Sequence, residues 1–381
     1  MGLQDTADVI IIGGGVIGLT VARALARRGA GRVLLLERNE LGAEASYAAG
    51  GMLAPQAEAD EAGDFMAFAC ASRDAYPEFA AQLLDESGVA IELDQTGTLY
   101  LALNEADEHE IARRFAWQNA AGLAVERLSG AEARRREPTL TPEIRAALFF
   151  PRDWQVDNRL LCQALAISCK RLSVDLRPHT PAREILLENG KIVGVATADT
   201  KIHVPVIVVA AGAWASLFPT GLLPEMKMSP VRGQMLCLQG PEGLARHVVY
   251  SPRGYIVPRS DGRILTGSTT EHAGFAKQVT LDGLRQITAH ALEIAPVLAE
   301  LPMIEAWAGL RPRAADGLPV LGPDPIISGL HYATGHYRNG ILLAPRTGEL
   351  IAAAIINGLT DTTLQAFGVT RFATLKAASN C

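Results

Sequence analysis

Three glycines near the N-terminus have the spacing of a dinucleotide-binding turn. Gly13, Gly15 and Gly18 follow a strand-like run, Ala7 to Ile12, and open a helix-like segment. Glu37 lies 19 positions after Gly18, at the end of a second apolar run. Such glycines permit a tight turn, close approach of a pyrophosphate and close helix–strand packing, while the acidic side chain accepts hydrogen bonds from ribose hydroxyls. The pattern predicts a Rossmann-type unit that binds FAD or NAD, and the charge of Glu37 disfavours NADP.

A run of small residues after this unit favours FAD over NAD. The segment from Leu41 to Met52 is rich in alanine and glycine. Small residues let a chain pass close under a bulky planar ligand, with its N–H groups free to bond it. The sequence contains no second fingerprint for a nicotinamide cofactor. We therefore expect one FAD.

The remaining pattern alternates between β-α-β stretches and antiparallel stretches. Asn189-Gly190 indicates a hairpin, and Asp261-Gly262 lies between short strands. Helices are expected at 65–88, broken near Tyr76-Pro77, and at 105–122, 160–172, 281–295 and 348–357. The pattern predicts an α/β fold in which a Rossmann-type FAD-binding domain with a parallel sheet is interleaved with an α+β substrate domain with a mostly antiparallel sheet. Residues 1–90, 155–225 and 308–381 are assigned to the first domain, and residues 91–154 and 226–307 to the second.

Four further motifs resemble the glycine oxidase branch of the D-amino-acid oxidase-like flavoenzymes, of the thiamine-biosynthesis type. They are the runs Ala48 to Pro55, Tyr255 to Arg259, Trp307 to Pro312 and Gly335 to Pro345. The resemblance covers nearly the whole chain and implies non-covalent FAD and oxidation of small amines by O2. Members act on glycine, sarcosine and some D-amino acids. Many supply glycine imine for the thiazole of thiamine, so the resemblance suggests thiazole synthase as a partner and a homo-oligomer, which is a tetramer in this family.

The resemblance also implies roles for single residues. Tyr255, Arg311 and Arg338 match the catalytic and substrate-binding positions of the family. Together with the three glycines of the fingerprint, the expected FAD contacts are Val16, Ile17, Glu37, Arg38, Ala45, Ser46, Gly50, Gly51, Met52 and Ala182, followed by His336, Tyr337, Arg338, Asn339, Gly340, Ile341 and Leu342 around the edge of the flavin ring.

The residue types at the substrate positions suit an amino acid. An arginine offers a carboxylate two donors in one plane, and a tyrosine hydroxyl adds a third. Arg311 is expected just after a strand at 305–309, and Arg338 in a glycine-flanked loop where it contacts the substrate or polarises the ring. The expected reaction is hydride transfer from the substrate Cα to flavin N5, without a protein acid or base. It gives the imine or glyoxylate, ammonia and H2O2.

Several alternatives stay open from the sequence. A dehydrogenase of the same fold would pass electrons to a quinone, and an oxidase of D-amino acids or N-substituted glycines would serve another pathway. A non-catalytic FAD-binding subunit would have no need of the tyrosine and arginine pair. Gly50 replaces an alanine common in the family, which suggests more room beside the ring. Arg253 and Arg313 form either surface ion pairs or a pocket mouth that admits a doubly acidic substrate, such as an N-carboxymethyl amino acid. His336 is expected to bond to the backbone or FAD rather than to shuttle protons.

Composition excludes several other classes. The chain has 381 residues, of which 49% are hydrophobic, and a net charge of −6 without a basic block that would attract nucleic acid. No uninterrupted apolar run approaches the roughly 18 residues of a membrane helix. The cysteines are odd in number and scattered, without the spacing of a metal site: Cys70, Cys162, Cys169, Cys237 and Cys381. We expect reduced thiols, no metal, no signal peptide and a cytoplasmic location.

Overall fold

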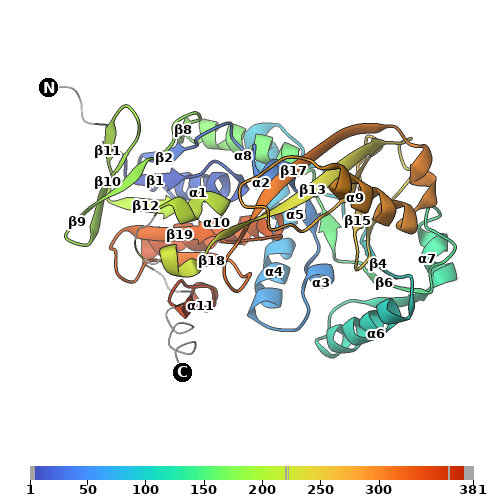
Figure 1. The fold of residues 1–381 in the computed structure, drawn as a ribbon. Coiled ribbons are helices and arrows are strands. Elements are labelled where there is room, and N and C mark those ends of the chain that lie inside the picture. Colours follow the sequence, from blue (N-terminus) through green and yellow to red (C-terminus); the bar gives the residue numbers. More distant parts are fainter. Residues whose placement is uncertain (1–4, 219–220, 222, 359–360, 373–381) are drawn as a thin grey trace.

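A six-stranded sheet built around the N-terminal strand forms one half of the protein (Figure 1). The computed structural model describes residues 5–218, 221, 223–358 and 361–372. The strand order is β18-β19-β12-β1-β2-β8. Neighbouring strands are parallel except at one edge, where β18 is antiparallel to β19. The strands are β1 (Val9–Ile12), β2 (Val33–Leu36), β8 (Asp175–Arg177), β12 (Val206–Val209), β18 (Val320–Pro323) and β19 (Leu330–Thr334).

Both faces of this sheet are covered, which explains why its central strands are apolar at every position. Val9 and Ile11 pack in one cluster with helices α1 (Val16–Arg27), α8 (Asn158–Arg171) and α10 (Gly340–Asn357). Ile10 and Ile12 point to the other face and pack against a three-stranded sheet. That sheet consists of β9 (Glu184–Glu188), β10 (Lys191–Ala196) and β11 (Lys201–His203). The predicted Rossmann-type unit is therefore β1-α1-β2, and the predicted hairpin is β9-β10.

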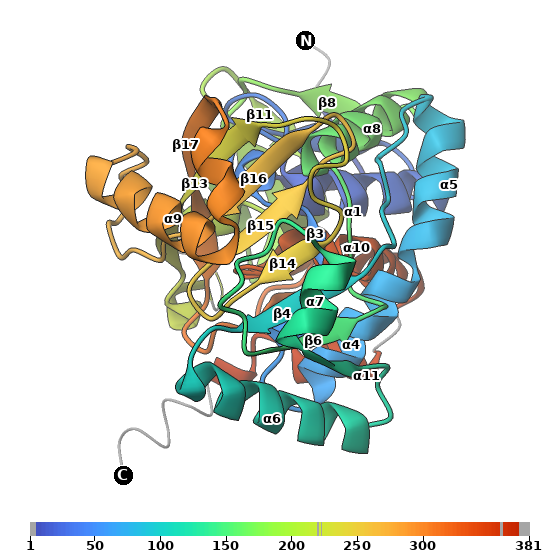
Figure 2. The same ribbon diagram turned by 90° about the vertical axis from the view of Figure 1, so that its right-hand side faces the viewer.

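An eight-stranded sheet forms the other half (Figure 2). Its order is β17-β13-β16-β15-β14-β4-β6-β5, and only the β14–β4 pair in it is parallel. Helices α7 (Gly130–Arg136) and α9 (Leu281–Ile294) cover one face, and α6 (Glu105–Ala120) packs on the other side. The strands are β4 (Thr98–Ala102), β5 (Glu126–Ser129), β6 (Ala146–Phe150), β13 (Ser229–Gln239), β14 (Val248–Tyr250), β15 (Tyr255–Pro258), β16 (Arg263–Gly267) and β17 (Met303–Arg313). The predicted fold class is confirmed.

Several short elements complete the fold. They are α2 (Ala45–Ala48), β3 (Met52–Leu53), α3 (Pro55–Glu58), β7 (Trp154–Gln155), α11 (Thr362–Ala366) and the 3₁₀ helices η1 (Gly212–Leu217), η2 (Leu223–Met226) and η3 (Pro296–Glu300). The expected break at Tyr76-Pro77 is present, because α4 (Asp64–Asp74) ends before α5 (Tyr76–Ser87) begins. Strand β17 continues across the predicted domain boundary at 307/308. The domain ranges themselves stay a prediction.

Two elements differ from expectation near the site. The strand that carries Arg311 runs on to Arg313, so Arg311 lies within a strand rather than after one. The closing helix begins at Gly340 instead of residue 348 and contains Pro345. Proline lacks the N–H that would bond to the carbonyl four residues earlier, which belongs to Ile341. The buried Tyr76 hydroxyl donates to that carbonyl instead, so the helix continues through the proline.

Helix α10 is also the one described helix whose length and composition would allow it to cross a membrane. More than half of it is buried within the protein, where it packs beside α1 and against the parallel sheet. Its apolar character is therefore explained by its place in the core.

Candidate functional site

A cavity of about 470 Å³ lies at the carboxyl ends of β1 and β2 and extends toward the eight-stranded sheet. It brings together most of the predicted cofactor residues. The following line it: Gly13, Gly15, Val16, Ile17, Glu37, Arg38, Ala45, Ser46, Gly50, Gly51, Met52, Ala182, His336, Tyr337, Arg338, Asn339, Gly340 and Ile341. Tyr255 and Arg311 line the same cavity.

Two predicted cofactor contacts, Gly18 and Leu342, do not line the cavity. A Cβ on Gly18 would lie 1.9 Å from the Gly13 carbonyl oxygen, so this glycine serves helix–strand packing, the role that its place in the fingerprint predicts. Leu342 is 1% exposed and belongs to the core between the helices and the parallel sheet. The residue falls on the inward side of the first turn of α10, which the expected loop did not anticipate.

The first turn of α1 is built to receive an anion. Gly15 is the residue before the helix and has no capping side chain, and the first turn contains no acidic residue. The Val16 N–H donates to the Ser46 hydroxyl at 2.9 Å. Helix N-termini carry partial positive charge, and their free N–H groups bind phosphate. Gly13 has a φ of 115°, and a Cβ there would lie 2.4 Å from the Ala210 carbonyl oxygen, so only glycine fits the turn.

Glu37 is held in place at the end of β2 by the backbone. Its two carboxylate oxygens accept from the Gly14 N–H at 2.7 Å and the Asn39 N–H at 2.9 Å. Each oxygen keeps further acceptor capacity for a ribose hydroxyl. The next residue, Arg38, stacks on the Trp214 ring at 3.6 Å from the centroid. Trp214 lines the cavity from η1, the 3₁₀ helix that follows β12, but sequence reasoning assigned it no role.

The segment of small residues lies where the two halves meet. A Cβ on Gly50 would lie 3.3 Å from the Met52 methyl and 3.5 Å from the Tyr255 ring, so these side chains take up the extra room that the glycine suggested. Buried Arg259 donates to the Gly50 carbonyl at 3.0 Å and to the Gln155 side chain at 2.7 Å. Burial lowers the pKa of Arg259 to about 10. Arg259 was only part of a motif at the sequence level, and the structure gives it the role of fixing this segment.

The pyrophosphate turn, the ribose carboxylate and the segment of small residues succeed one another along one cavity, as an extended dinucleotide requires. The residues present therefore fit FAD. None of the described cysteines lines the cavity, and all four are free thiols. Burial raises the pKa of Cys162 and of Cys169 to about 12, which makes both unreactive. Cys381 lies outside the described residues. The described part of the chain contains no group of three side chains suited to a metal ion.

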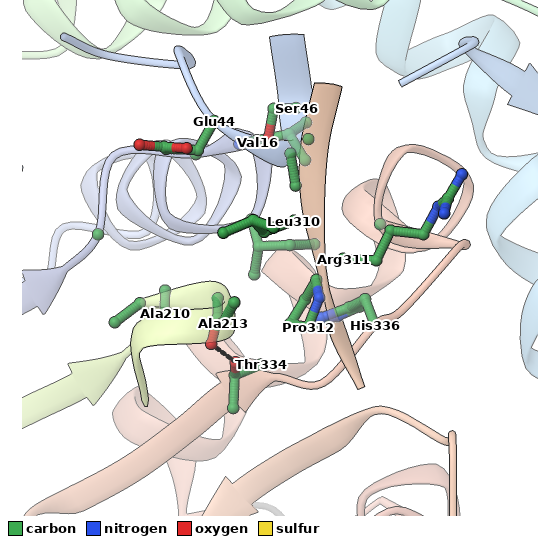
Figure 3. A pocket seen from close by; sticks show the side chains of 18 of the residues that line it. Val16, Glu44, Ser46, Ala210, Ala213, Leu310, Arg311, Pro312, Thr334 and His336 are labelled. Carbon is green, nitrogen blue, oxygen red and sulfur yellow. Dashed lines mark hydrogen bonds between the residues drawn. The ribbon is translucent and has the colours of Figure 1, made fainter. Parts of the chain in front are cut away.

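Arg311 extends from β17 on the side opposite to Leu310, which faces Val16 and Ser46 (Figure 3). Its guanidinium donates to the Ser268 hydroxyl at 2.6 Å and to the Thr269 carbonyl at 3.1 Å. Both acceptors are neutral, and within the described chain Arg311 forms no ion pair. Its guanidinium is therefore available to an anionic ligand.

Two neighbours shape the surroundings of Arg311. The Tyr255 hydroxyl donates to the Met235 sulfur at 3.2 Å, which is a weak acceptor that a carboxylate would readily replace. Across the strand pair, a Cβ on Gly233 would lie only 2.3 Å from an Arg311 guanidinium nitrogen. Gly233 therefore leaves the space that the arginine side chain occupies. Sequence reasoning missed it because this contact depends on the pairing of β13 with β17.

Arg338 lies in the turn before α10, as expected, but its guanidinium is already engaged. It forms an ion pair with the Glu58 carboxylate, in which Nε lies 3.0 Å from Oε2 and Nη2 donates to Oε1 at 3.1 Å. The Tyr250 hydroxyl donates to Glu58 Oε1 at 2.6 Å. Burial alone would raise the pKa of Glu58, but Arg338 and these hydrogen bonds outweigh it, so the pKa is lowered and the carboxylate stays ionised. Glu58 and Tyr250 were not predicted, and no sequence motif marks them.

A second cavity of about 770 Å³ adjoins the first and shares several lining residues with it. Arg253 lines it but forms ion pairs with Asp107 and Glu293, both at 2.9 Å, which confirms the surface-pair interpretation for this residue. Arg313 also lines it and lies 6.0 Å from the centroid of the Tyr337 ring. In the described part of the chain, Arg313 forms no ion pair.

His336 is buried, and its Nε2 lies 3.1 Å from the Thr347 hydroxyl of α10. This partner is a side chain that the early start of α10 brings beside the ring, and the expectation that His336 bonds to the backbone or FAD stays a prediction. Burial lowers the pKa of His336 to about 3, so the imidazole is neutral at physiological pH. A neutral ring with a fixed partner is not suited to carry protons.

Comparisons with known proteins find similar sequences and similar structures. Residues 8–354 match the family model described as FAD dependent oxidoreductase. The chain is 36% identical over 347 residues to a glycine oxidase from Pseudomonas aeruginosa. The aligned region covers 90% of this chain and 93% of that protein. It is similar to the crystal structure of glycine oxidase from Geobacillus kaustophilus, with a TM-score of 0.91, 32% identity and coverage of 97% and 99% of the two chains. It is also 36% identical over 373 residues to the bifunctional protein ThiO/ThiG of Trichormus variabilis, covering 96% of this chain and 55% of that one.

Proposed function

This chain belongs to the FAD-dependent oxidoreductase family, and from that premise we propose that it oxidises glycine or a related small amine. The products are the imine, or glyoxylate and ammonia after hydrolysis, together with H2O2. The observation that carries the proposal is the position of Arg311 and Tyr255. Both line the cavity whose other end carries the pyrophosphate turn and Glu37. A carboxylate-binding pair and a dinucleotide site thus share one enclosed space.

The chain's own residues bind and orient the substrate. Arg311 receives the carboxylate, and Ser268 and Thr269 hold the guanidinium so that it presents a fixed fork. Tyr255 turns its hydroxyl from the Met235 sulfur to the same carboxylate. FAD, when bound, supplies the redox chemistry by accepting two electrons and the hydrogen of the substrate Cα. Positioning of this kind is worth several orders of magnitude in rate.

The pathway, the cellular location and the oligomeric state are proposed as well. The link to thiazole synthesis is supported by the ThiO/ThiG protein, in which a similar chain covers about half of a bifunctional polypeptide. A cytoplasmic location is supported by the free thiols of the four described cysteines. A homo-oligomer is suggested by the family resemblance alone, and light scattering of the purified protein would test it.

A substrate panel tests the proposal directly. Glycine, sarcosine, D-alanine and D-proline are mixed anaerobically with the holoprotein, and loss of the yellow flavin colour is recorded. We expect glycine to bleach the flavin and admission of O2 to restore it with release of H2O2. Release of the colour on denaturation tests non-covalent binding. Reoxidation by a quinone but not by O2 would indicate a dehydrogenase, and no bleaching by any amine would refute the proposal.

A second candidate substrate class is favoured by Arg313. This arginine lines the outer cavity without an ionic partner in the described chain, and it lies two residues from Arg311 on the same strand. Alternate residues of a strand point to the same face. An N-carboxymethyl amino acid could therefore place a second carboxylate near Arg313. Adding iminodiacetate to the panel tests this class.

A further inference from the structure

The two cavities meet at an ion pair that the proposed carboxylate binding does not use. Glu58, Arg338, Tyr250 and Tyr255 line both cavities. The Glu58 and Arg338 side chains are only 13% and 33% exposed. The pair thus stands between the position of a bound amino acid and the outer cavity.

Glu58 occupies Arg338 in the way that a substrate carboxylate would. Its two oxygens face Nε and Nη2 at 3.0 and 3.1 Å, the two-donor arrangement that guanidinium groups offer to carboxylates. The Tyr250 hydroxyl also donates to Glu58 Oε1, at 2.6 Å. Tyr250 is itself stacked on Tyr100, with ring centroids 6.3 Å apart and an interplanar angle of 4°. Separating the pair would leave an enclosed charge unpaired, which is costly.

Arg311 contrasts with Arg338 in this respect. Its partners, Ser268 and Thr269, are neutral, so it remains a free cation in the same cavity. Both arginines lie close enough to Glu58 to lower its pKa, but only Arg338 forms an ion pair with it. Arg313, which forms no ion pair in the described part of the chain, lines the outer cavity rather than the inner one.

We propose that Glu58 is a specificity-determining positioning residue that withdraws Arg338 from carboxylate binding. Arg311 is then the cation that binds the substrate carboxylate in the inner cavity, and a second carboxylate placed beside Arg338 is disfavoured there. The inference rests on the proposed function for its substrate class. The effect of Glu58 on carboxylate binding, however, can be measured with acids that the protein does not oxidise.

The test uses acetate and malonate, which have one and two carboxylates and no amine to oxidise. Each is titrated into the holoprotein, and the dissociation constant is read from the change in flavin absorbance. In Glu58→Gln the amide keeps the size of the side chain but frees the charge of Arg338. We expect the affinity for malonate relative to acetate to rise about tenfold, which corresponds to one charge-assisted hydrogen bond. Among amines that the enzyme can oxidise, the KM of Glu58→Gln for iminodiacetate should fall relative to its KM for glycine, with little change in kcat.

A matched control separates release of Arg338 from a general change of charge. Glu61 lines the outer cavity and is exposed, and the carboxylate that pairs with Arg338 is that of Glu58. Glu61→Gln removes the same charge and should leave the malonate-to-acetate ratio within about twofold of the parent, as expected for an exposed charge. Adding Arg338→Met to Glu58→Gln should abolish the gain.

The outcomes decide the inference in either direction. An unchanged ratio in a Glu58→Gln protein with a normal flavin spectrum would overturn it, as would an equal rise in Glu61→Gln. If Glu58→Gln does not fold, the double variant Glu58→Gln/Arg338→Met removes both charges and decides alone. Its acetate affinity should match the parent, and a tenfold loss would show that Arg338 binds the carboxylate after all. Failure of every amine to bleach the flavin would refute the proposed function, while the acetate and malonate titrations would still test Glu58.

Discussion

At the scale of single residues, the site depends on groups whose charge is fixed by their surroundings. His336 is neutral because it is buried, and Glu58 is ionised because Arg338 and Tyr250 hold it. Arg311 is free because its partners are neutral. Their residue types alone do not determine these states, since each state follows from contacts made by residues far away in the sequence.

Burial of His336 predicts a pH dependence of stability. The pKa is lowered to about 3 in the folded protein, against about 6.5 when the chain is unfolded. As the pH falls, the imidazole of His336 therefore becomes protonated in the unfolded state before it does so in the folded state. The stabilising contribution is fully present above pH ~6.5 and is lost as the pH falls toward the folded pKa, at up to about 1.4 kcal/mol per pH unit.

Urea unfolding of the parent and His336→Gln at pH 7, 6 and 5 measures this effect. The difference in free energy of unfolding between the two proteins should move in favour of the variant as the pH falls. His109 is exposed and serves as a control, because His109→Gln should show no such trend. A difference independent of pH would contradict the burial argument for His336.

At the scale of elements, pairing between strands positions the substrate arginine. Gly233 on β13 leaves the space for the Arg311 guanidinium on β17, where a Cβ would come within 2.3 Å. Gly233→Ala should displace that side chain and raise the KM for glycine about tenfold or more, a loss of one or two charge-assisted hydrogen bonds. The flavin spectrum should stay normal, because β1 and α1 are untouched. Gly63→Ala is the control, since an added methyl there meets nothing within 4 Å. An unchanged KM in Gly233→Ala would contradict the prediction.

The early start of α10 predicts a compensating pair of substitutions. Tyr76→Phe removes the hydroxyl that donates to the Ile341 carbonyl, leaving a buried acceptor without a partner. We expect a loss of about 1–3 kcal/mol in the free energy of unfolding. Adding Pro345→Ala restores an N–H four residues after Ile341, so the double variant should recover most of the loss. Thermal or urea unfolding of the parent, the two single variants and the double variant checks this. Equal instability of Tyr76→Phe and the double variant would argue against it.

At the scale of the whole molecule, the cofactor cavity joins two sheets and is lined by segments from both ends of the chain. A ligand that binds only the folded state stabilises it, by about 2.7 kcal/mol at a concentration of 100 times Kd. Removal of FAD should therefore lower the melting temperature, and titration with FAD should raise it again. NADP at the same concentrations should have little effect because Glu37 faces the 2′-phosphate. Stabilisation by NADP equal to that by FAD would contradict the role assigned to Glu37.

The sequence predicted the parts of the site that depend on local spacing. The turn at Gly13 and the carboxylate of Glu37 lie within one β-α-β unit, where a short pattern determines the structure. Glu58, Tyr250 and Gly233 were missed because each acts through a partner that the fold brings from a distant segment. The start of α10 was missed because Pro345 ordinarily ends a helix, and the compensating Tyr76 hydroxyl lies in another helix.

Strand β17 limits the insertions and deletions that the protein can accept. Leu310 and Arg311 are neighbours that point to opposite sides, one toward the pyrophosphate turn and one toward the substrate space (Figure 3). Because side chains alternate along a strand, insertion or deletion of one residue before Leu310 would exchange the two sides. The hairpin tip at Asn189-Gly190 is exposed and lines neither cavity, and its Gly190 carbonyl accepts a hydrogen bond from the Ser328 N–H at 3.0 Å. A longer turn there would change this surface contact but would leave both cavities in place, whereas the eleven residues of β17 form a segment of fixed length.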